Sequence, residues 1–211
     1  MLPIRLSKSL TAASANAIAL SQSLASAGNL TLNGASASGG VATLDTQRRV
    51  LVTSAGNDSG ITFTVTGASE SGTPISQTLT GANAGTAVTT LDFLTVTQVS
   101  ASGATASTVT VGTNTVGSTP WKMQAWELAS QNLQFSTTVS GTINYSIEVT
   151  PDDFYTPGLT VVPAAFPTST AGAVGATQLN LSEPWTGWRL TVNSGTGTAS
   201  LRCIQAGIAV A

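Results

Sequence analysis

Only a few residues of this sequence could support catalysis, and two adjacent aspartates are the first to consider. Asp152 and Asp153 follow a segment of alternating apolar residues and stand close to Tyr155. Two carboxylates can hydrolyse a glycosidic bond when they flank it across a cleft, about 5 Å or about 6.5–9.5 Å apart. Adjacent side chains on an extended chain point in opposite directions. We therefore expect an Asp-rich turn that closes a hairpin here.

A second group of oxygen-bearing side chains, Asn57, Asp58 and Ser59, could contribute ligands to calcium. A calcium ion takes about six to eight oxygen ligands, and calcium loops supply them from acidic residues at regular spacing. This sequence has no such ladder of aspartates after Asp58. Gly, Asn, Asp and Ser are also the residues that form tight turns. The stretch 54–60 is therefore predicted to be a turn and not a metal site.

Nucleophilic catalysis needs a base beside the nucleophile, and the sequence offers few bases. It contains no histidine, the commonest general base and metal ligand. Its only amine side chains, Lys8 and Lys122, are not part of a Ser-x-x-Lys pattern. The single cysteine, Cys203, alternates with Leu201 and Ala199, which predicts a buried core thiol and excludes an intrachain disulfide. We expect no catalytic residue, no metal site and no cofactor.

The chain carries little charge for its length. Of 211 residues, 7 are Lys or Arg and 9 are Asp or Glu, so charged residues make up 8% and the net charge is −2. Average globular proteins carry about 25% charged residues. The basic residues are scattered, which argues against a nucleic-acid partner. No stretch approaches the roughly 18 apolar residues of a membrane helix, and polar residues interrupt 1–28 too often for a signal peptide.

Low charge makes association between copies easy. We interpret this composition as typical of a chain that works inside an assembly, where neighbours cover much of its surface. A secreted, Thr/Ser-rich sandwich is the alternative that the same composition fits.

The stretch 48–67 has the pattern that the rest of the chain repeats. Between residues 61 and 66, apolar residues alternate with threonines, which places apolar side chains on one sheet face and hydroxyls on the other. The clearest hairpin pairs 133–139 with 143–149 across Ser140-Gly141. In the stretch 88–100 the apolar phase shifts between Phe93 and Leu94, which predicts a bulge or burial on both faces.

Short strands at roughly 8–12-residue spacing, with turn residues between them, predict an all-β fold of sandwiches or barrels. We predict two β-sandwich domains, Ig-like or jelly-roll-like, over residues 30–118 and 119–211, with a linker at 114–120. Residues 1–29 are rich in Ala and Ser, with Leu and Ala near helical spacing. They are predicted to form an extended or partly helical N-terminal arm against a neighbouring subunit. A disordered tail is the alternative.

The candidate interface residues are aromatic and basic. All of the tryptophans lie in the second half of the chain: Trp121, Trp126, Trp185 and Trp188. Trp188 fits the alternation of a core strand, whereas Trp121 and Trp126 are predicted at a contact between domains or subunits, where aromatic residues are enriched. A sugar-binding platform is a further option for these rings. Arg48 and Arg49 are the only basic pair, and they are interpreted as a solvated strand edge and as candidate interface residues.

Several hairpin sequences together resemble structural proteins of tailed-bacteriophage virions. The resemblance spans most of residues 30–207 and is carried by five segments: Arg-Val-Leu-Val-Thr-Ser-Ala-Gly-Asn-Asp-Ser-Gly-Ile-Thr-Phe-Thr-Val-Thr-Gly at 49–67, Leu-Thr-Gly-Ala-Asn-Ala-Gly-Thr at 79–86, Ser-Thr-Val-Thr-Val-Gly-Thr at 107–113, Val-Ser-Gly-Thr-Ile-Asn-Tyr-Ser-Ile-Glu-Val-Thr-Pro-Asp-Asp at 139–153 and Arg-Leu-Thr-Val-Asn-Ser-Gly-Thr-Gly at 189–197. The Pro-rich stretch 156–167 departs from the shorter loop expected there.

The resemblance implies a non-enzymatic virion component, either a capsid decoration (cement) protein or a part of the head–tail or tail apparatus. It implies no catalytic residues. We expect a homotrimer or ring that binds other virion proteins, the major capsid protein first, with no nucleic acid and no membrane as partner. Such a protein is located in the virion and assembles in the cytoplasm of the host bacterium. The alternatives are a tail, adaptor or fibre component, a host- or glycan-binding module, and an enzyme with convergent carboxylates.

Overall fold

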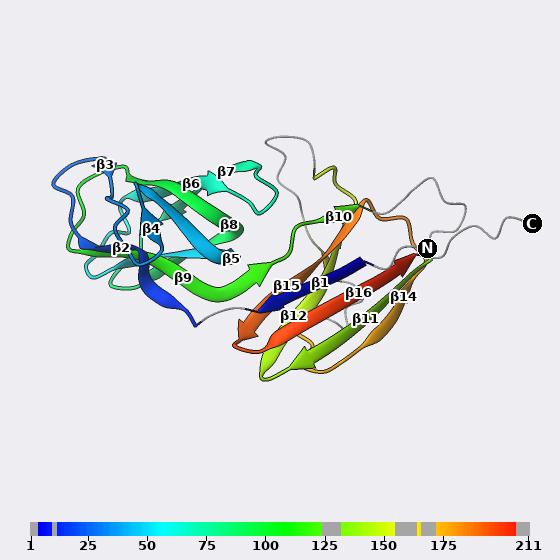
Figure 1. Cartoon of the computed structure of the whole chain (residues 1–211). Helices are drawn as coiled ribbons and strands as arrows, with labels where there is room; N and C mark the ends of the chain where they lie inside the picture. Colours follow the sequence, from blue (N-terminus) through cyan, green and yellow to red (C-terminus); the bar gives the residue numbers. More distant parts are fainter. Residues whose placement is uncertain (1–3, 10–11, 124–131, 155–163, 166–171, 206–211) are drawn as a thin grey trace, which may run out of the picture. The chain divides into compact units, whose positions relative to one another are not determined.

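The computed structural model describes residues 4–9, 12–123, 132–154, 164–165 and 172–205. This part of the chain contains strands and turns and no helix, so the all-β prediction is confirmed. It accordingly contains no helix long and apolar enough to cross a membrane. The strands are β1 (Ile4–Ser9), β2 (Ser14–Gln22), β3 (Gly28–Asn29), β4 (Ala37–Ser38), β5 (Val41–Ser54), β6 (Thr62–Ala68), β7 (Pro74–Thr80), β8 (Thr86–Ala101), β9 (Val109–Ser118), β10 (Lys122–Met123), β11 (Leu133–Ser140), β12 (Ile143–Thr150), β13 (Ala164–Ala165), β14 (Gln178–Leu181), β15 (Gly187–Gly195) and β16 (Thr198–Gln205) (Figure 1).

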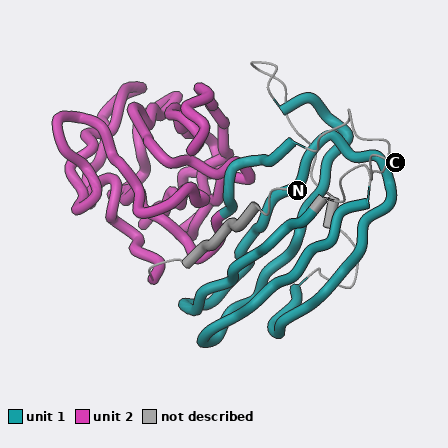
Figure 2. The backbone as a smooth tube through the Cα atoms, turned by 45° about the vertical axis from the view of Figure 1, so that its right-hand side comes forward, with its two compact units in different colours: residues 1–10, 118–211 teal, residues 11–117 magenta. Residues whose placement is uncertain are grey.

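The chain forms two compact units, coloured separately in Figure 2. Unit 2 is the continuous stretch Thr11–Gly117. Unit 1 combines Met1–Leu10 with Ser118–Ala211, so the beginning of the chain belongs to the same unit as its second half.

In unit 2 the antiparallel strands follow the order β9-β5-β8-β6-β7, with β2 added to β9, β3 to β8 and β4 to β5. The predicted alternation of β6 is present: Phe63 and Val65 are fully buried, while the threonines between them are half-buried. The core draws buried apolar side chains from β5, β6, β7, β8 and β9, together with Ile18 of β2, and its two phenylalanines are Phe63 and Phe93. Each strand therefore contributes one face to a shared apolar cluster.

Unit 1 contains a sheet in the order β1-β16-β11-β14 and a second set of strands, β13-β12-β15, with β10 paired to β15. The predicted hairpin of 133–139 with 143–149 is wrong, because β11 pairs with β14 and β16 while β12 pairs with β13 and β15. Its core draws Phe135 and Leu201 from the first sheet and Tyr145, Trp188 and Leu190 from the second set. Phe135 and Trp188 meet edge to face with ring centroids 5.3 Å apart, a favoured aromatic geometry. The placement of Trp188 in the core is confirmed.

The prediction of an N-terminal arm is not confirmed for the described residues of 1–29. Ile4–Ser9 pairs with β16 over its whole length, as strand β1. Ser14–Gln22 forms β2 against β9, and its Ala17, Ile18 and Ala19 are buried. The near-helical spacing of Leu and Ala did not indicate a helix here. A loop covers β2 at its three buried residues, where the amides of Gly34 and Ser36 donate to the carbonyls of Ile18 and Ala17.

One other boundary differs from expectation, and one detail is confirmed. Asn114–Ser118, expected in a linker, continues β9. The register of β5 against β8 shifts on both sides of the Arg48–Phe93 pair. Asp92 and Phe93 are both buried, so the irregularity predicted near Phe93 is present, and it explains how adjacent side chains can both avoid solvent.

One glycine of unit 2 is required by a close approach between strands. A Cβ on Gly67 would fall on the carbonyl oxygen of Thr95 in the neighbouring strand β8. The register of β6 against β8 also shifts between Thr66 and Gly67. The bulge therefore brings two backbones together at a point where only glycine fits.

Replacing Gly67 with alanine should destabilise unit 2 by roughly 1–3 kcal/mol, the usual cost of forcing extra atoms into a packed site. The control is Gly60→Ala, since nothing lies within 4 Å of a Cβ there. Urea unfolding of both variants, followed by far-ultraviolet circular dichroism, measures their unfolding midpoints. Equal midpoints for the two would contradict the close approach at Gly67.

Candidate functional site

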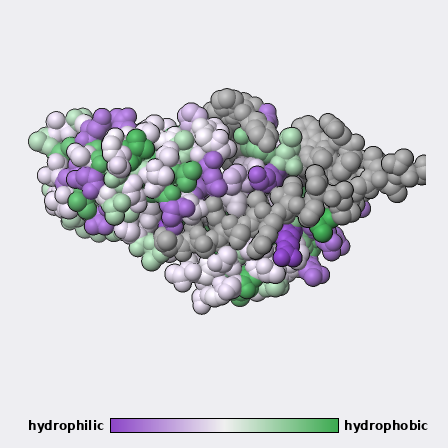
Figure 3. All heavy atoms as spheres, viewed as in Figure 1, coloured by the Kyte–Doolittle hydropathy of each residue, from purple (hydrophilic) through white to green (hydrophobic). Residues whose placement is uncertain are grey.

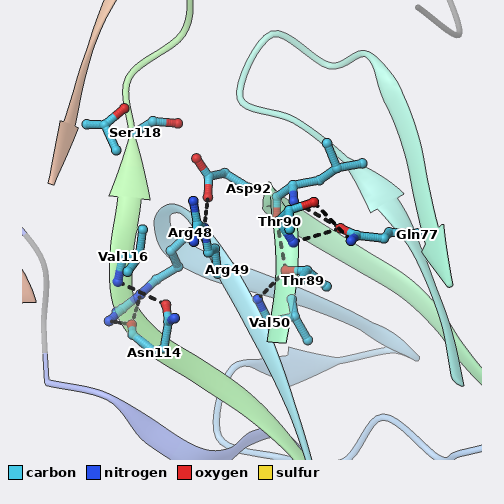
Figure 4. A network of polar contacts seen from close by, with 12 residues as sticks. Arg48, Arg49, Val50, Gln77, Thr89, Thr90, Asp92, Asn114, Val116 and Ser118 are labelled. Carbon is cyan, nitrogen blue, oxygen red and sulfur yellow. Dashed lines mark hydrogen bonds and ion pairs between the residues drawn. The ribbon is translucent and has the colours of Figure 1, made fainter. Parts of the chain in front are cut away.

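Arg48 is buried inside unit 2, so its predicted place at a solvated edge or interface is wrong. Its side chain is 1% exposed. Nη1 donates to Oδ1 of Asp45 at 2.9 Å, Nε donates to the carbonyl oxygen of Asn114 at 3.0 Å, and Nη2 donates to the same oxygen (Figure 4). A guanidinium has several donors in a fixed fork, and here the fork ties β5 to β9. Thr46, Gln47 and Arg48 are buried in succession, at the point where the register of β5 against β9 shifts between Arg48 and Val50, so the burial does not follow the two-residue period.

Arg49 lies on the opposite face of β5 and remains partly open to solvent. Its side chain is 34% exposed, and its Nε lies 3.7 Å from Oδ1 of Asp92, whose side chain is 3% exposed. The side chain is therefore near a carboxylate and still partly accessible to solvent. An interface role for Arg49 therefore stays a prediction.

Gln77 was not singled out from the sequence, yet it connects β7 to the irregular part of β8. Its Oε1 accepts from the amides of Thr90 at 2.9 Å and Leu91 at 3.0 Å, and its Nε2 donates to Oγ1 of Thr90 at 3.0 Å (Figure 4). Beside it, Oγ1 of Thr89 accepts from the amide of Val50 at 2.9 Å. These side chains satisfy backbone groups that the bulge removes from the regular ladder. The only sequence signal was the phase shift in β8.

Trp121 is half-buried within unit 1 and already has packing partners there. Its ring stacks against Phe154 with centroids 5.9 Å apart, and the guanidinium carbon of Arg189 lies 4.6 Å from its centroid. Arg189 in turn donates from Nε to Oε2 of Glu148 at 2.7 Å, and Thr191 donates to the same oxygen at 2.8 Å. The cation–π contact and the ion pair hold the indole in place. With the ring engaged in this way, nothing in this arrangement favours the sugar-platform option at Trp121.

An exposed apolar side chain, Met123, lies close to Trp121 in the sequence. Met123 follows two residues later, pairs with Gly187 across β10 and β15, and is 49% exposed. An exposed methionine beside a half-buried tryptophan suits a protein contact, so the interface prediction for Trp121 stays open. Trp126, the other predicted aromatic contact, lies outside the described residues.

The acidic candidates occupy turns. The amide of Asp152 donates to Oγ1 of Thr150 at 3.1 Å, just after β12. Asn57 accepts from the amide and hydroxyl of Ser59 at 3.2 and 2.7 Å, and Asp58, which is 2% exposed, accepts from the amide of Ala106 at 2.7 Å. These side chains form hydrogen bonds with loop backbone groups, which stabilises the loops. Within the ranges the structure describes, no three His, Cys, Asp or Glu side chains gather as they would around a metal ion.

Comparisons of the chain with protein-family models, with curated proteins and with solved structures found no match. Inference about function therefore depends on the residues themselves.

Replacing Arg48 with methionine should destabilise unit 2 by about 1–3 kcal/mol, because the Asn114 carbonyl and the Asp45 carboxylate lose their donors. Methionine keeps much of the volume, so the lost bonds dominate. The control is Arg202→Met, an exposed arginine of β16, which should change the free energy of unfolding by less than about 0.5 kcal/mol. Urea denaturation of both variants measures the difference. A stable Arg48→Met protein would mean that the guanidinium bonds contribute nothing net.

Cys203 should be inert in the folded protein. It is buried in the core of unit 1, and burial raises the pKa of its thiol to about 12. Thiolate, the reactive form, is therefore scarce at pH 8. A thiol reagent should leave the native chain unmodified and label one cysteine per chain in urea.

Because the unfolded chain loses the Cys203 thiol proton at a lower pH than the folded chain, stability should fall as the pH rises from about 9 toward 12. The Cys203→Ala variant should lack that alkaline loss, and rapid native labelling would contradict the burial.

Proposed function

We propose that the protein is a non-enzymatic structural component of a tailed-phage virion, most simply a decoration protein that cements the head lattice. The sequence resemblance suggests the setting. The structural observation that carries the proposal is how the described units use their polar groups: several charges are paired internally, while the outer sheet faces carry hydroxyls. This arrangement suits a surface that is covered by neighbours.

The internal use of charge is seen in both units. In unit 2, Arg48 contacts Asp45 and Arg49 lies near Asp92. In unit 1, Arg189 pairs with Glu148, and both side chains are mostly buried. Charges held this way contribute little to keeping copies apart in solution.

The outer faces present hydroxyl groups that bond to one another across strands. Thr64 meets Thr78 at 2.9 Å, and Thr53 meets Thr86 at 3.0 Å. In Figure 3, many of the visible described atoms take colours near the middle of the hydropathy scale, with small polar and apolar patches among them. Such a surface has a low desolvation cost compared with a charged one, which favours broad contact with a flat partner.

Within this proposal each unit is a β-sandwich, since each core cluster draws its buried residues from several strands that face one another. The two units would contact different neighbours in the lattice, with Trp121 and Met123 of unit 1 in one contact. A protein that binds only the assembled shell stabilises it by mass action. Closed symmetry would favour a trimer or ring.

The first test is the mass of the purified full chain by light scattering, followed by co-sedimentation with empty capsids of its own phage. A decoration protein should pellet with the capsids at a saturating ratio and raise their melting temperature. A ring that ignores capsids would place the protein in the tail apparatus and overturn the decoration role. A monomer that binds neither capsids nor tails would overturn the virion proposal.

A variant pair sharpens that test. Met123→Glu places a charge beside Trp121 and should weaken co-sedimentation at least tenfold if this surface is a contact. Val174→Glu is the matched control, because Val174 is also an exposed apolar residue of unit 1, at 69%. Equal binding by both variants would exclude the Trp121 surface from the interface.

A further inference from the structure

Strand β7 lies at the end of the strand order in unit 2. It pairs in antiparallel fashion with β6 over seven residues, from Pro74 opposite Ala68 to Thr80 opposite Thr62, and Figure 1 shows the two strands side by side. The order β5-β8-β6-β7 ends there. The second long side of β7 is therefore an open sheet edge among the described residues.

The hydrogen bonds around β6 show which groups of β7 face that edge. The amide of Gly81 donates to the carbonyl of Ile61 at 2.9 Å, in register with the β6–β7 pairs. On the other side of β6, the amide of Ser102 donates to the carbonyl of Thr62 at 2.9 Å. Antiparallel bonding alternates from residue to residue, so odd-numbered residues of β6 bond to β7 and even-numbered ones to β8.

The same alternation applies along β7. Its odd-numbered residues bond back to β6, which leaves the N–H and C=O groups of Ser76, Thr78 and Thr80 directed to the free edge. The side chains of these three residues are exposed too. Three donors and three acceptors thus lie in a row over about five residues, or roughly 13 Å of extended chain.

This edge lacks the usual protection. Natural edge strands carry charges, prolines or bulges that prevent pairing with another chain. Pro74–Thr80 contains no charged residue, and its single proline stands at the first position. Other described edges differ: β1 contains Arg5 and Lys8, and β14 has only four residues. The edge of β7 is therefore suited to receive a strand.

We propose that β7 pairs with β7 of a second copy of this chain, antiparallel and centred on Thr78. The argument for a second copy comes from β6, the strand with which β7 already pairs. On β6, Thr62, Thr64 and Thr66 present hydroxyls at alternate positions, and Thr64 and Thr66 bond to Thr78 and Ser76 across the pair. A second β7 carries hydroxyls with the same two-residue period.

The pairing is self-complementary. Two-fold symmetry about Thr78 sets Thr78 opposite its own copy and Ser76 opposite Thr80 of the second copy, with hydroxyl facing hydroxyl and no like charges opposed. The sheets of two copies become continuous. This contact is separate from any contact that closes a trimer or ring, and in a lattice it would join neighbouring oligomers. It does not rest on the proposed virion role.

The test is the mass of the full chain over a concentration series, for the wild type, Thr78→Lys and Thr97→Lys. Thr78→Lys opposes two lysines at the symmetry axis and should halve the mass. Thr97→Lys adds the same charge at an exposed position of β8 and should keep the wild-type mass. A wild-type chain that stays monomeric, or equal masses for both variants, would overturn the pairing without bearing on capsid binding.

A crosslink tests the register. Residues opposite each other in a bonded antiparallel pair have Cα atoms about 5.5 Å apart, within the range of about 4.4–6.8 Å for a disulfide. Under mild oxidation Thr78→Cys should form covalent dimers, while Ser71→Cys, in the exposed turn before β7, should not. Buried Cys203 adds no background. Failure of Thr78→Cys to crosslink, or equal crosslinking of both variants, would overturn the proposed register.

Discussion

The two-residue period of an extended chain is the constraint on which the rest of this structure depends. In β6, Phe63 and Val65 enter the core while the threonines between them stay on the outer face. The same division in β12 and β15 builds the core of unit 1 from Tyr145, Ile147 and Leu190. Because the period admits no intermediate, a shift by one residue would exchange the two faces. Register is therefore set by burial wherever one face is apolar.

Where the period is broken, polar side chains form the hydrogen bonds that backbone groups would form with each other in a regular ladder. The register of β5 against β8 shifts twice, and the strands there would leave amides and carbonyls without partners. Arg48 reaches the carbonyl of Asn114, and Gln77 accepts from the amides of Thr90 and Leu91. Burying such groups is costly unless they are fully bonded. These polar contacts therefore belong to the architecture of unit 2.

The functional proposals follow from what remains outside. Several charges are paired within the units, and hydroxyl rows, the Trp121–Met123 surface and the edge of β7 are the features proposed to meet neighbours. Each is suited to extensive, weakly polar contact between ordered surfaces. None concentrates the groups that would activate a nucleophile. A structural role in an assembly would use these features together, whereas Trp121, a candidate ring for a glycan, already contacts Phe154 and Arg189.

The sequence by itself determined the all-β class, the irregularity in β8 and the burial of Trp188 and Cys203, because each depends on local alternation. It did not determine strand pairing: turn residues at Ser140-Gly141 connect β11 and β12, yet these strands pair with other partners in different sheets. Only the tertiary structure decided that residues 4–9 and 14–22 join different units and that Gln77 bridges β7 to β8, since these depend on pairing between distant segments. Arg48 belongs to the second case: its sequence context favoured a solvated strand edge, and only the carbonyl of Asn114, far away in sequence, makes burial of its charge tolerable.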